Sequence, residues 1–170
     1  MHVRQEVFDD RAGVYAVAHA AFASGDQTIE PVEVGLLQNL FDCPQYDPDF
    51  SMIALDEEAV IGHVIASWGS VGGNYPLLGL GPLAVAPEYQ QRGVGSILMQ
   101  AIHDRAKERG LPGIVLLGHI DYYRRFGYEP AVSHGILPSD PEWGDHFMVK
   151  VLDADKLPVG PYRYAAPFGC

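Results

Sequence analysis

The clearest chemical signal in the sequence is a pair of glycines in the stretch YQQRGVGS, residues 89–96. The stretch follows an apolar run and directly precedes a segment of helical periodicity. Glycine accepts left-handed backbone angles and lets a ligand approach the main chain closely. The first N–H groups of a helix lack helical partners and attract negative charge. Gly93 and Gly95 therefore predict a main-chain cradle for an anion, with a phosphate-bearing ligand as the first candidate.

Two common phosphate-binding motifs do not fit this loop. A nucleoside-triphosphate P-loop ends in Gly-Lys-Ser/Thr, whereas this loop ends in Gly95-Ser96 without a lysine. A dinucleotide fingerprint requires a third glycine, and Leu98 stands in its place. What remains is the pattern Gln90-x-x-Gly93-x-Gly95, placed after an unusual strand.

The strand before the loop, PLLGLGPLAVAP at 76–87, is apolar enough to be central but contains Gly81 and Pro82. Proline cannot donate to a strand ladder, so it is confined to edges, strand starts and bulges. The pattern predicts a strand that bulges or splays away from its neighbour at Gly81–Pro82. Its later residues would then offer main-chain groups without a strand partner: Leu83, Ala84 and Val85.

The other elements are placed by their apolar periodicity. The expected elements, in chain order, are a strand at 2–8, helices at 11–23 and from Pro31, a hairpin of strands at 50–55 and 60–68, a helix at 94–109, a strand at 113–118, a helical turn from 121 closed by Gly127, a strand start directly after it, and a tail after 133 with Pro-rich loops and one clear strand at 146–152. This order indicates an α+β or mixed α/β sheet of six or seven strands.

The stretch LGPLAVAPEYQQRGVGSILM resembles the central strand, pyrophosphate loop and helix of the GCN5-related N-acetyltransferases (GNAT family). The later YYRRFGYE is similar to the family segment in which a tyrosine, here Tyr123, stands four positions before Gly-Phe/Tyr. The resemblance covers residues 1–130. It implies one N-acetyltransferase domain over 1–170, with a mixed, mostly antiparallel sheet, splayed central strands and about four flanking helices.

The resemblance also implies acetyl-CoA as co-substrate, and no metal. The pantetheine arm would pair with the main chain of Leu83, Ala84 and Val85, as an added strand does. The pyrophosphate would lie on the N–H groups that open the following helix. These groups belong to Gln91, Arg92, Gly93, Val94, Gly95 and Ser96. Arg92 adds a cation, although simple exposure to solvent would also explain it, and the Ser96 hydroxyl can donate or cap the helix.

Acetyl transfer to an amine needs an acid for the leaving thiolate and a route for the amine's proton. Tyr123 is the candidate acid, because it occupies the family's tyrosine position just beyond the strand at 113–118; the alternative is a core aromatic. Its neighbour Tyr122 is assigned to packing. The Val85 N–H is the natural donor to the oxyanion.

The general base stays open. His119 and His63 titrate in a useful range, but a lone histidine in an apolar strand is more often structural. Glu30 and Glu33 could line the acceptor pocket or simply form a solvated helix face. Asp121 could cap a helical turn as easily as act on a proton, and water is a further alternative.

Composition limits the remaining possibilities. The 170 residues are 48% hydrophobic and 19% charged, which suits one globular domain. A net charge of −11 argues against nucleic acid as a partner, although basic residues gather between Arg92 and Arg125 and suit a small anionic ligand. Cys43 and Cys170 form neither a disulfide framework nor a metal site. The sequence lacks a secretory leader and an apolar run able to span a bilayer, so we expect a cytoplasmic protein without a membrane partner.

The favoured function is acetyl transfer from acetyl-CoA to an amine of a small molecule or protein. Two alternatives remain: a non-catalytic acyl-CoA-binding sensor module, and an acyltransferase that uses another acyl chain or an O-linked acceptor. The sequence contains no recognisable acceptor motif. The acidic balance mildly favours a cationic amine. A homodimer is compatible with the sequence but has no specific support.

Overall fold

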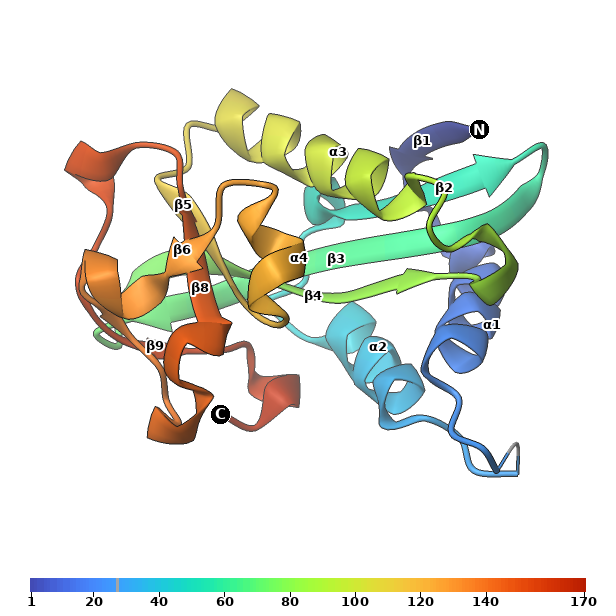
Figure 1. Ribbon diagram of the computed structural model, residues 1–170, viewed down its shortest axis with the longest axis horizontal. Helices are drawn as coiled ribbons and strands as arrows, with labels where there is room; N and C mark the ends of the chain where they lie inside the picture. Colours follow the sequence, from blue (N-terminus) through green and yellow to red (C-terminus); the bar gives the residue numbers. More distant parts are fainter. Residues whose placement is uncertain (27) are drawn as a thin grey trace. The chain divides into compact units, whose positions relative to one another are not determined.

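The computed structural model describes residues 1–26 and 28–170 (Figure 1), and they form two compact units. The first unit comprises Met1–Ala66 and Pro82–Arg105, and the second comprises Ser67–Gly81 and Ala106–Cys170. Three elements contribute to both units: β3 (Ala59–Val71), β4 (Tyr75–Val85) and α3 (Val94–Glu108).

In the first unit, strand β1 (His2–Gln5) pairs antiparallel with β2 (Ser51–Asp56), and β2 pairs antiparallel with β3. The pairing between β2 and β3 shifts by one residue next to Ala54, which marks a bulge. Two helices precede β2: α1 (Arg11–Phe22) and α2 (Val32–Asp42). Both bury residues at the three- and four-residue spacings that the sequence predicted, and these are Val14, Val17 and Ala18 in α1, and Val34, Leu37, Leu40 and Phe41 in α2.

Helices cover both faces of the first unit's strands (Figure 1). On one face, α3 packs so closely on Gly62 of β3 that a Cβ there would lie 2.9 Å from Leu98 and 3.0 Å from Val94. The next residue, His63, points to the other face, where the Phe41 ring of α2 lies 6.0 Å away. The N-terminal end of α3 is therefore fixed by its contact with a strand.

The second unit is organised around β5 (Gly113–Leu117), which runs parallel to β4 and antiparallel to β8 (Phe147–Val151). Helix α4 (Ile120–Arg124) follows β5, and β6 (Glu129–Pro130) pairs with β8. In the tail, β9 (Gly160–Arg163) pairs antiparallel with β3 and parallel with β7 (Ile136–Leu137).

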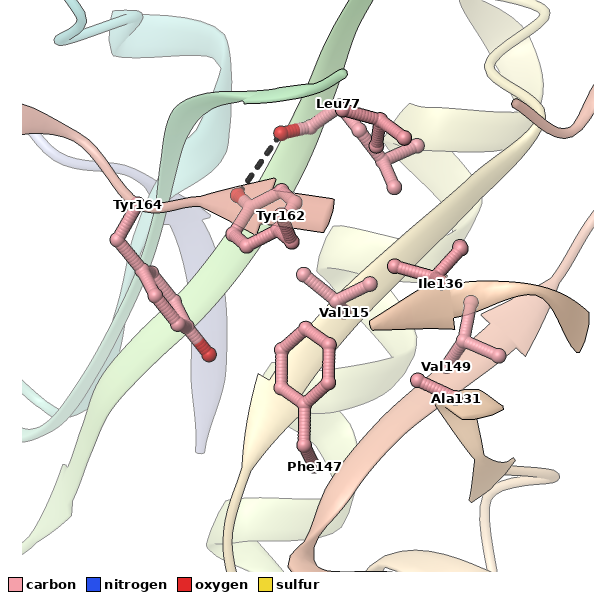
Figure 2. Packing of buried hydrophobic residues seen from close by; sticks show 9 residues of the cluster. Leu77, Val115, Ala131, Ile136, Phe147, Val149, Tyr162 and Tyr164 are labelled. Carbon is pink, nitrogen blue, oxygen red and sulfur yellow. Dashed lines mark hydrogen bonds between the residues drawn. The ribbon is translucent and has the colours of Figure 1, made fainter. Parts of the chain in front are cut away.

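The core of the second unit combines aliphatic side chains with three aromatic ones, Phe147, Tyr162 and Tyr164 (Figure 2). The Tyr162 and Tyr164 rings lie 4.9 Å apart and nearly perpendicular, and the Tyr162 hydroxyl donates a hydrogen bond of 3.0 Å to the carbonyl oxygen of Leu77. Both rings pack onto Gly79 of β4, where a Cβ would come within 2.6–2.9 Å of them. The absence of a side chain at Gly79 thus leaves the space that the tail's aromatic rings occupy.

The elements expected as far as residue 128 are confirmed, including four α-helices. Two expectations were wrong. The described residues form nine strands rather than about six or seven, and the tail contributes β7 and β9 in addition to the expected strand β8, whereas β6 is the strand start expected after Gly127. Strand β7 has only two residues and β9 has four, beginning with Gly160-Pro161, so their pairing partners rather than their own sequences make them strands. Among the described residues, no helix combines the length and apolarity needed to cross a membrane.

Candidate functional site

The ladder between β4 and β5 is short and ends where the sequence predicted a divergence. It pairs Leu78 with Ile114, Gly79 with Val115, and Leu80 with Leu116, and then stops. The next residue, Gly81, has a φ of 135°, outside the range of ordinary strand residues. Strand β4 nevertheless continues to Val85. The predicted irregularity at Gly81–Pro82 is therefore confirmed.

The last residues of β4 divide into two sets by the direction of their main-chain groups. The N–H of Ala86 donates to Ile61 in β3, at 2.8 Å. Because directions alternate along a strand, the main chain of Ala84 also turns toward β3, while Leu83 and Val85 turn away from it. The Val85 carbonyl oxygen accepts a 3.1 Å hydrogen bond from the Gln90 side chain. Of the three residues predicted to hold the pantetheine arm, Leu83 and Val85 have the suitable direction.

The glycine loop leads from β4 into α3 with left-handed residues at two positions. Gln91 has a φ of 62° and Gly93 a φ of 84°, a pattern that turns successive N–H groups toward a common side. A Cβ built on Gly93 would have no heavy atom within 4 Å, so the space in front of this residue is open. In the described chain, no N–H of residues 91–96 makes a hydrogen bond of standard geometry with another group. The loop therefore has the free donors and the space that a phosphate requires.

The base of this loop is held by a short polar contact. The Tyr89 hydroxyl donates to the Asp56 carboxylate at 2.6 Å. The Arg92 guanidinium lies 5.8 Å from the Tyr89 ring centroid, and its side chain is exposed. Arg92 thus stands beside the open donors, where a cation would attract an anionic ligand.

Tyr123 lies on α4, directly after the carboxyl end of β5, and its ring packs on Gly118 so closely that a Cβ at Gly118 would overlap it. Burial, reinforced by the neighbouring Tyr122, raises the pKa of the Tyr123 phenol to about 12. In the described chain, the Tyr123 hydroxyl has no hydrogen-bond partner. The Tyr122 ring is covered instead by the Arg125 guanidinium, 4.5 Å from its centroid, as packing predicts. Tyr123 is thus a protonated and unengaged donor.

The candidate base His63 is part of the core of the first unit. Its side chain is 1% exposed, and its Nε2 lies 2.9 Å from the Ser51 hydroxyl oxygen. Burial lowers the pKa of His63 to about 3. The ring is therefore neutral near pH 7 and a poor proton acceptor there, which fits a structural role.

The other predicted base candidates are dispersed over the two units. Glu30 is exposed and Glu33 lies in the first turn of α2, both in the first unit. His119 is exposed at the N-cap position of α4 in the second unit. Asp121, in the first turn of α4, makes no side-chain cap.

One histidine that the sequence did not single out contacts Gly118, the residue on which the Tyr123 ring packs. His146 and Gly118 are joined by two hydrogen bonds of 3.0 Å, one from the Gly118 N–H to the His146 carbonyl oxygen and one between the His146 Nδ1 and the Gly118 carbonyl oxygen. The two residues are 28 positions apart, so no local pattern could have connected them.

Comparison with known proteins adds an independent line of information. Residues 14–128 match the acetyltransferase (GNAT) family. The uncharacterized N-acetyltransferase YhbS of Escherichia coli K12 is 30% identical over 159 residues, which cover 92% of this chain and 90% of YhbS. The uncharacterized N-acetyltransferase YjhQ of the same strain is 35% identical over 104 residues, 59% of this chain. That alignment spans only 58% of YjhQ.

Two solved structures share the fold over nearly the whole chain. YhbS from Escherichia coli in complex with CoA has a TM-score of 0.86 and 29% identity, covering 99% of this chain and 92% of YhbS. A GNAT family acetyltransferase from Brucella melitensis in complex with acetyl-CoA has a TM-score of 0.76 and 29% identity, covering 98% and 97%. The predicted fold class is confirmed by these likenesses.

Proposed function

The chain belongs to the GNAT family of acetyltransferases, and on this basis we propose that it transfers an acetyl group from acetyl-CoA to the nitrogen of an amine. The observation that carries the proposal is the loop at 91–96, whose N–H groups make no hydrogen bond of standard geometry in the described chain and whose Gly93 borders open space. These N–H groups lack a hydrogen-bond acceptor, and a diphosphate supplies acceptor oxygens that carry negative charge. Two structural neighbours bind CoA or acetyl-CoA, which supports this choice of ligand.

We assign the parts of acetyl-CoA to the groups described above. The diphosphate accepts from the N–H groups of residues 91–96, with Arg92 as a nearby cation. The pantetheine arm pairs with the main chain of Leu83 and Val85, in the manner of an added strand. The Val85 N–H is the proposed donor to the thioester oxygen as negative charge develops on it.

Tyr123 is the proposed acid. When the amine nitrogen attacks the thioester carbon, the carbon–sulfur bond breaks and the sulfur leaves with negative charge. A phenol whose pKa is raised to about 12 stays protonated at neutral pH and can hydrogen-bond this sulfur throughout the reaction. The sulfur receives its proton either through the phenol, which is then reprotonated from solvent, or from the attacking nitrogen.

The loop assignment is tested by Gly93→Glu. A carboxylate in the open space should repel the diphosphate and block two or more charge-assisted hydrogen bonds, weakening acetyl-CoA binding by about 100-fold or more. The matched control is Gly110→Glu, because Gly110 also has a positive φ of 69° and open space but lies at the far end of α3. Calorimetric titration with acetyl-CoA would contradict the assignment if both variants bound alike.

The enzymatic claim is tested separately by release of free CoA thiol with a panel of primary amines. An acyl-CoA sensor would bind acetyl-CoA yet release no thiol with any amine. An O-acyltransferase would release thiol with alcohols instead, and one specific for longer chains would prefer a longer acyl-CoA. Cytoplasmic location and a possible homodimer stay predictions.

A further inference from the structure

A separate pocket lies within the second unit at the carboxyl end of β5 and has a volume of about 390 Å³. The residues that line it are Leu117, Gly118, His119, Glu142, Trp143 and His146. Leu117 ends β5, and Glu142, Trp143 and His146 belong to the short 3-10 segment Pro141–His146. The lining combines the apolar Leu117 and Trp143 with the polar His119, Glu142 and His146, a mixture that is typical of small-molecule sites.

The segment Pro141–His146 is held in one conformation at both ends. At its start, the Asp140 carboxylate accepts from the Glu142 N–H at 2.9 Å, and the Asp140 carbonyl oxygen accepts from the Trp143 N–H at 3.1 Å. Gly144, with a φ of 50° and a ψ of −134°, turns the chain back toward β5. At its end, His146 is bound to Gly118 by two hydrogen bonds. The pocket is therefore formed before a ligand arrives.

The contact with Gly118 fixes the protonation pattern of the His146 ring. A carbonyl oxygen can only accept, so the His146 Nδ1 at 3.0 Å from it must carry the proton. In the neutral ring, Nε2 then has a lone pair and is the proton acceptor. A hydrogen bond from the other ring nitrogen to a carbonyl is the usual way to orient a histidine base.

Glu142 and Trp143 suit a cationic ligand. The Trp143 indole is held by two aromatic contacts, with ring centroids 5.9 Å from Phe147 and 6.0 Å from Tyr164. Tryptophan presents the aromatic face that best attracts an ammonium ion, and the exposed Glu142 carboxylate adds a negative charge. Among the described residues that line the pocket, none is a lysine or arginine, so a carboxylate on the ligand would find no positive partner.

Gly118 joins this pocket to the proposed acid. The Tyr123 ring packs against its Cα, and His146 is bonded to its main chain. A proton donor and a proton acceptor thus both contact one small residue. An acyl transfer from a thioester to an amine needs this pair of functions close together.

We propose that this pocket binds the acceptor as a primary alkylammonium ion without an adjacent carboxylate, and that the His146 Nε2 removes its proton. The proposal rests on the acetyltransferase function proposed above. Glu142 and Trp143 bind the ammonium form, which dominates at neutral pH for an amine with a pKa of about 10.4. The body of the amine lies against Leu117 and Trp143.

The reaction removes two protons from the amine nitrogen. The ammonium ion gives one proton to the His146 Nε2, which makes the ring an imidazolium. The freed nitrogen lone pair forms the bond to the acetyl carbon, and the carbon–sulfur bond breaks. The nitrogen loses its second proton, the departing sulfur gains one, and the imidazolium releases the remaining proton to water.

His146→Asn separates the two functions of this side chain. The asparagine N–H can keep the hydrogen bond to the Gly118 carbonyl oxygen, whereas the basic Nε2 is lost. With acetyl-CoA and phenethylamine at neutral pH, we expect His146→Asn to lower kcat/KM by about 100- to 1,000-fold. With phenylalaninamide, whose α-amine has a pKa of about 7.7–8.0 and is partly neutral already, we expect a loss of less than about tenfold. Equal losses for the two amines would overturn the assignment of the base.

The preference for a cation is tested by Glu142→Gln, a change of charge at an exposed site. The wild type should use phenylalaninamide at least about tenfold better than phenylalanine, whose carboxylate meets Glu142. Glu142→Gln should raise KM for phenethylamine by about 3- to 10-fold with little change in kcat. The same variant should also show a smaller preference for phenylalaninamide over phenylalanine. If Glu142→Gln changed neither KM for phenethylamine nor the preference for phenylalaninamide over phenylalanine, the assignment of this pocket to the acceptor would be overturned.

Binding without turnover separates this proposal from the function on which it depends. Phenethylamine added without acetyl-CoA should quench Trp143 fluorescence, detected as the difference between the wild type and Trp143→Phe, and Glu142→Gln should weaken that binding. If the amine binds but no thiol is released, the pocket stands and the acetyltransferase function fails. If thiol is released and neither Glu142→Gln nor His146→Asn affects it, the function stands and the pocket fails.

Discussion

At the scale of single residues, burial acts in opposite directions on the two most perturbed candidates. It raises the pKa of Tyr123 to about 12 and lowers the pKa of His63 to about 3. In both cases it favours the neutral form, because a low-dielectric environment opposes charge. The consequence for Tyr123 is a permanent O–H donor, whereas the consequence for His63 is a neutral ring hydrogen-bonded to Ser51.

The role of Tyr123 predicts a separation of catalysis from binding. Tyr123→Phe should lower kcat by about 100- to 10,000-fold, the usual effect of losing a general acid. Acetyl-CoA affinity should be unchanged, because the proposed binding groups lie on other elements. Tyr122→Phe is the matched control and should keep most of the activity, since the ring contacts of Tyr122 with Tyr123, Arg125 and Phe126 do not need its hydroxyl. Steady-state kinetics with equilibrium titration would contradict the role if both variants were equally active.

The buried His63 predicts a specific loss of stability in acid. Its folded pKa of about 3 is below the unfolded value of about 6.5, so the unfolded chain binds the extra proton. The contribution is complete above pH 6.5 and falls by about 1.4 kcal/mol per pH unit as the pH drops toward 3. Urea unfolding at several pH values should show this slope reduced in the double variant Ser51→Ala, His63→Met, which leaves no unpaired hydroxyl. His2→Gln, at an exposed histidine, should leave the slope unchanged.

The parts of the site that could be predicted from the sequence are those that depend on single residues and their immediate neighbours. The glycines of the loop and Gly81–Pro82 act through their own backbone angles, and the positive φ at Gly81 and Gly93 follows from them. The contact between His146 and Gly118 could not be predicted from the sequence, because it depends on how the segment after Asp140 returns to β5. The same limit applies to His63, whose environment is set by partners in β2 and α2.

At the scale of elements, β4 combines predictable and unpredictable features. Its interruption at Gly81 could be predicted, since proline and glycine break a ladder regardless of the partner. The need for Gly79 could not be predicted, because the Tyr162 and Tyr164 rings that occupy the space beside it come from the tail, about 85 residues away. The tail strands were underestimated for the same reason.

The close packing at Gly79 predicts that alanine there is destabilising. A Cβ would press on the Tyr162 hydroxyl and the Tyr164 ring, and overpacking of this kind costs about 1–3 kcal/mol. Gly35→Ala in α2 is the control, because no heavy atom lies within 4 Å of a Cβ there. That change should stabilise the chain by about 0.5–1 kcal/mol, as expected in a helix interior. Denaturant unfolding should give opposite signs, and two destabilised variants would contradict this reading of β4.

At the scale of the whole molecule, stability in alkali depends on buried phenols. Tyr128, Tyr162 and Tyr164 are 1%, 2% and 7% exposed, and burial raises the pKa of each above its ordinary value. A tyrosine whose folded pKa is raised stays protonated in the native state after it has ionised in the unfolded chain. Its contribution is therefore complete below pH 10 and is lost as the pH rises above it.

Together these three phenols predict a steep alkaline limb. Above pH 10 the free energy of unfolding should fall by about 4 kcal/mol per pH unit, at about 1.4 kcal/mol for each tyrosine. Urea unfolding between pH 8 and 11.5, combined with phenolate absorbance, measures both quantities. Ionisation of these tyrosines near pH 10 in the folded protein, without loss of stability, would disprove the explanation.

The central claim is that free main-chain N–H groups at 91–96 hold the diphosphate of acetyl-CoA. Hydrogen exchange of these amides, measured with saturating acetyl-CoA and with S-acetylpantetheine, tests it most directly because only the first ligand has a diphosphate. We predict that acetyl-CoA slows exchange at several of these positions by about tenfold or more, as new hydrogen bonds would, and that S-acetylpantetheine does not. Saturation with acetyl-CoA that leaves the exchange of 91–96 unchanged would contradict the account.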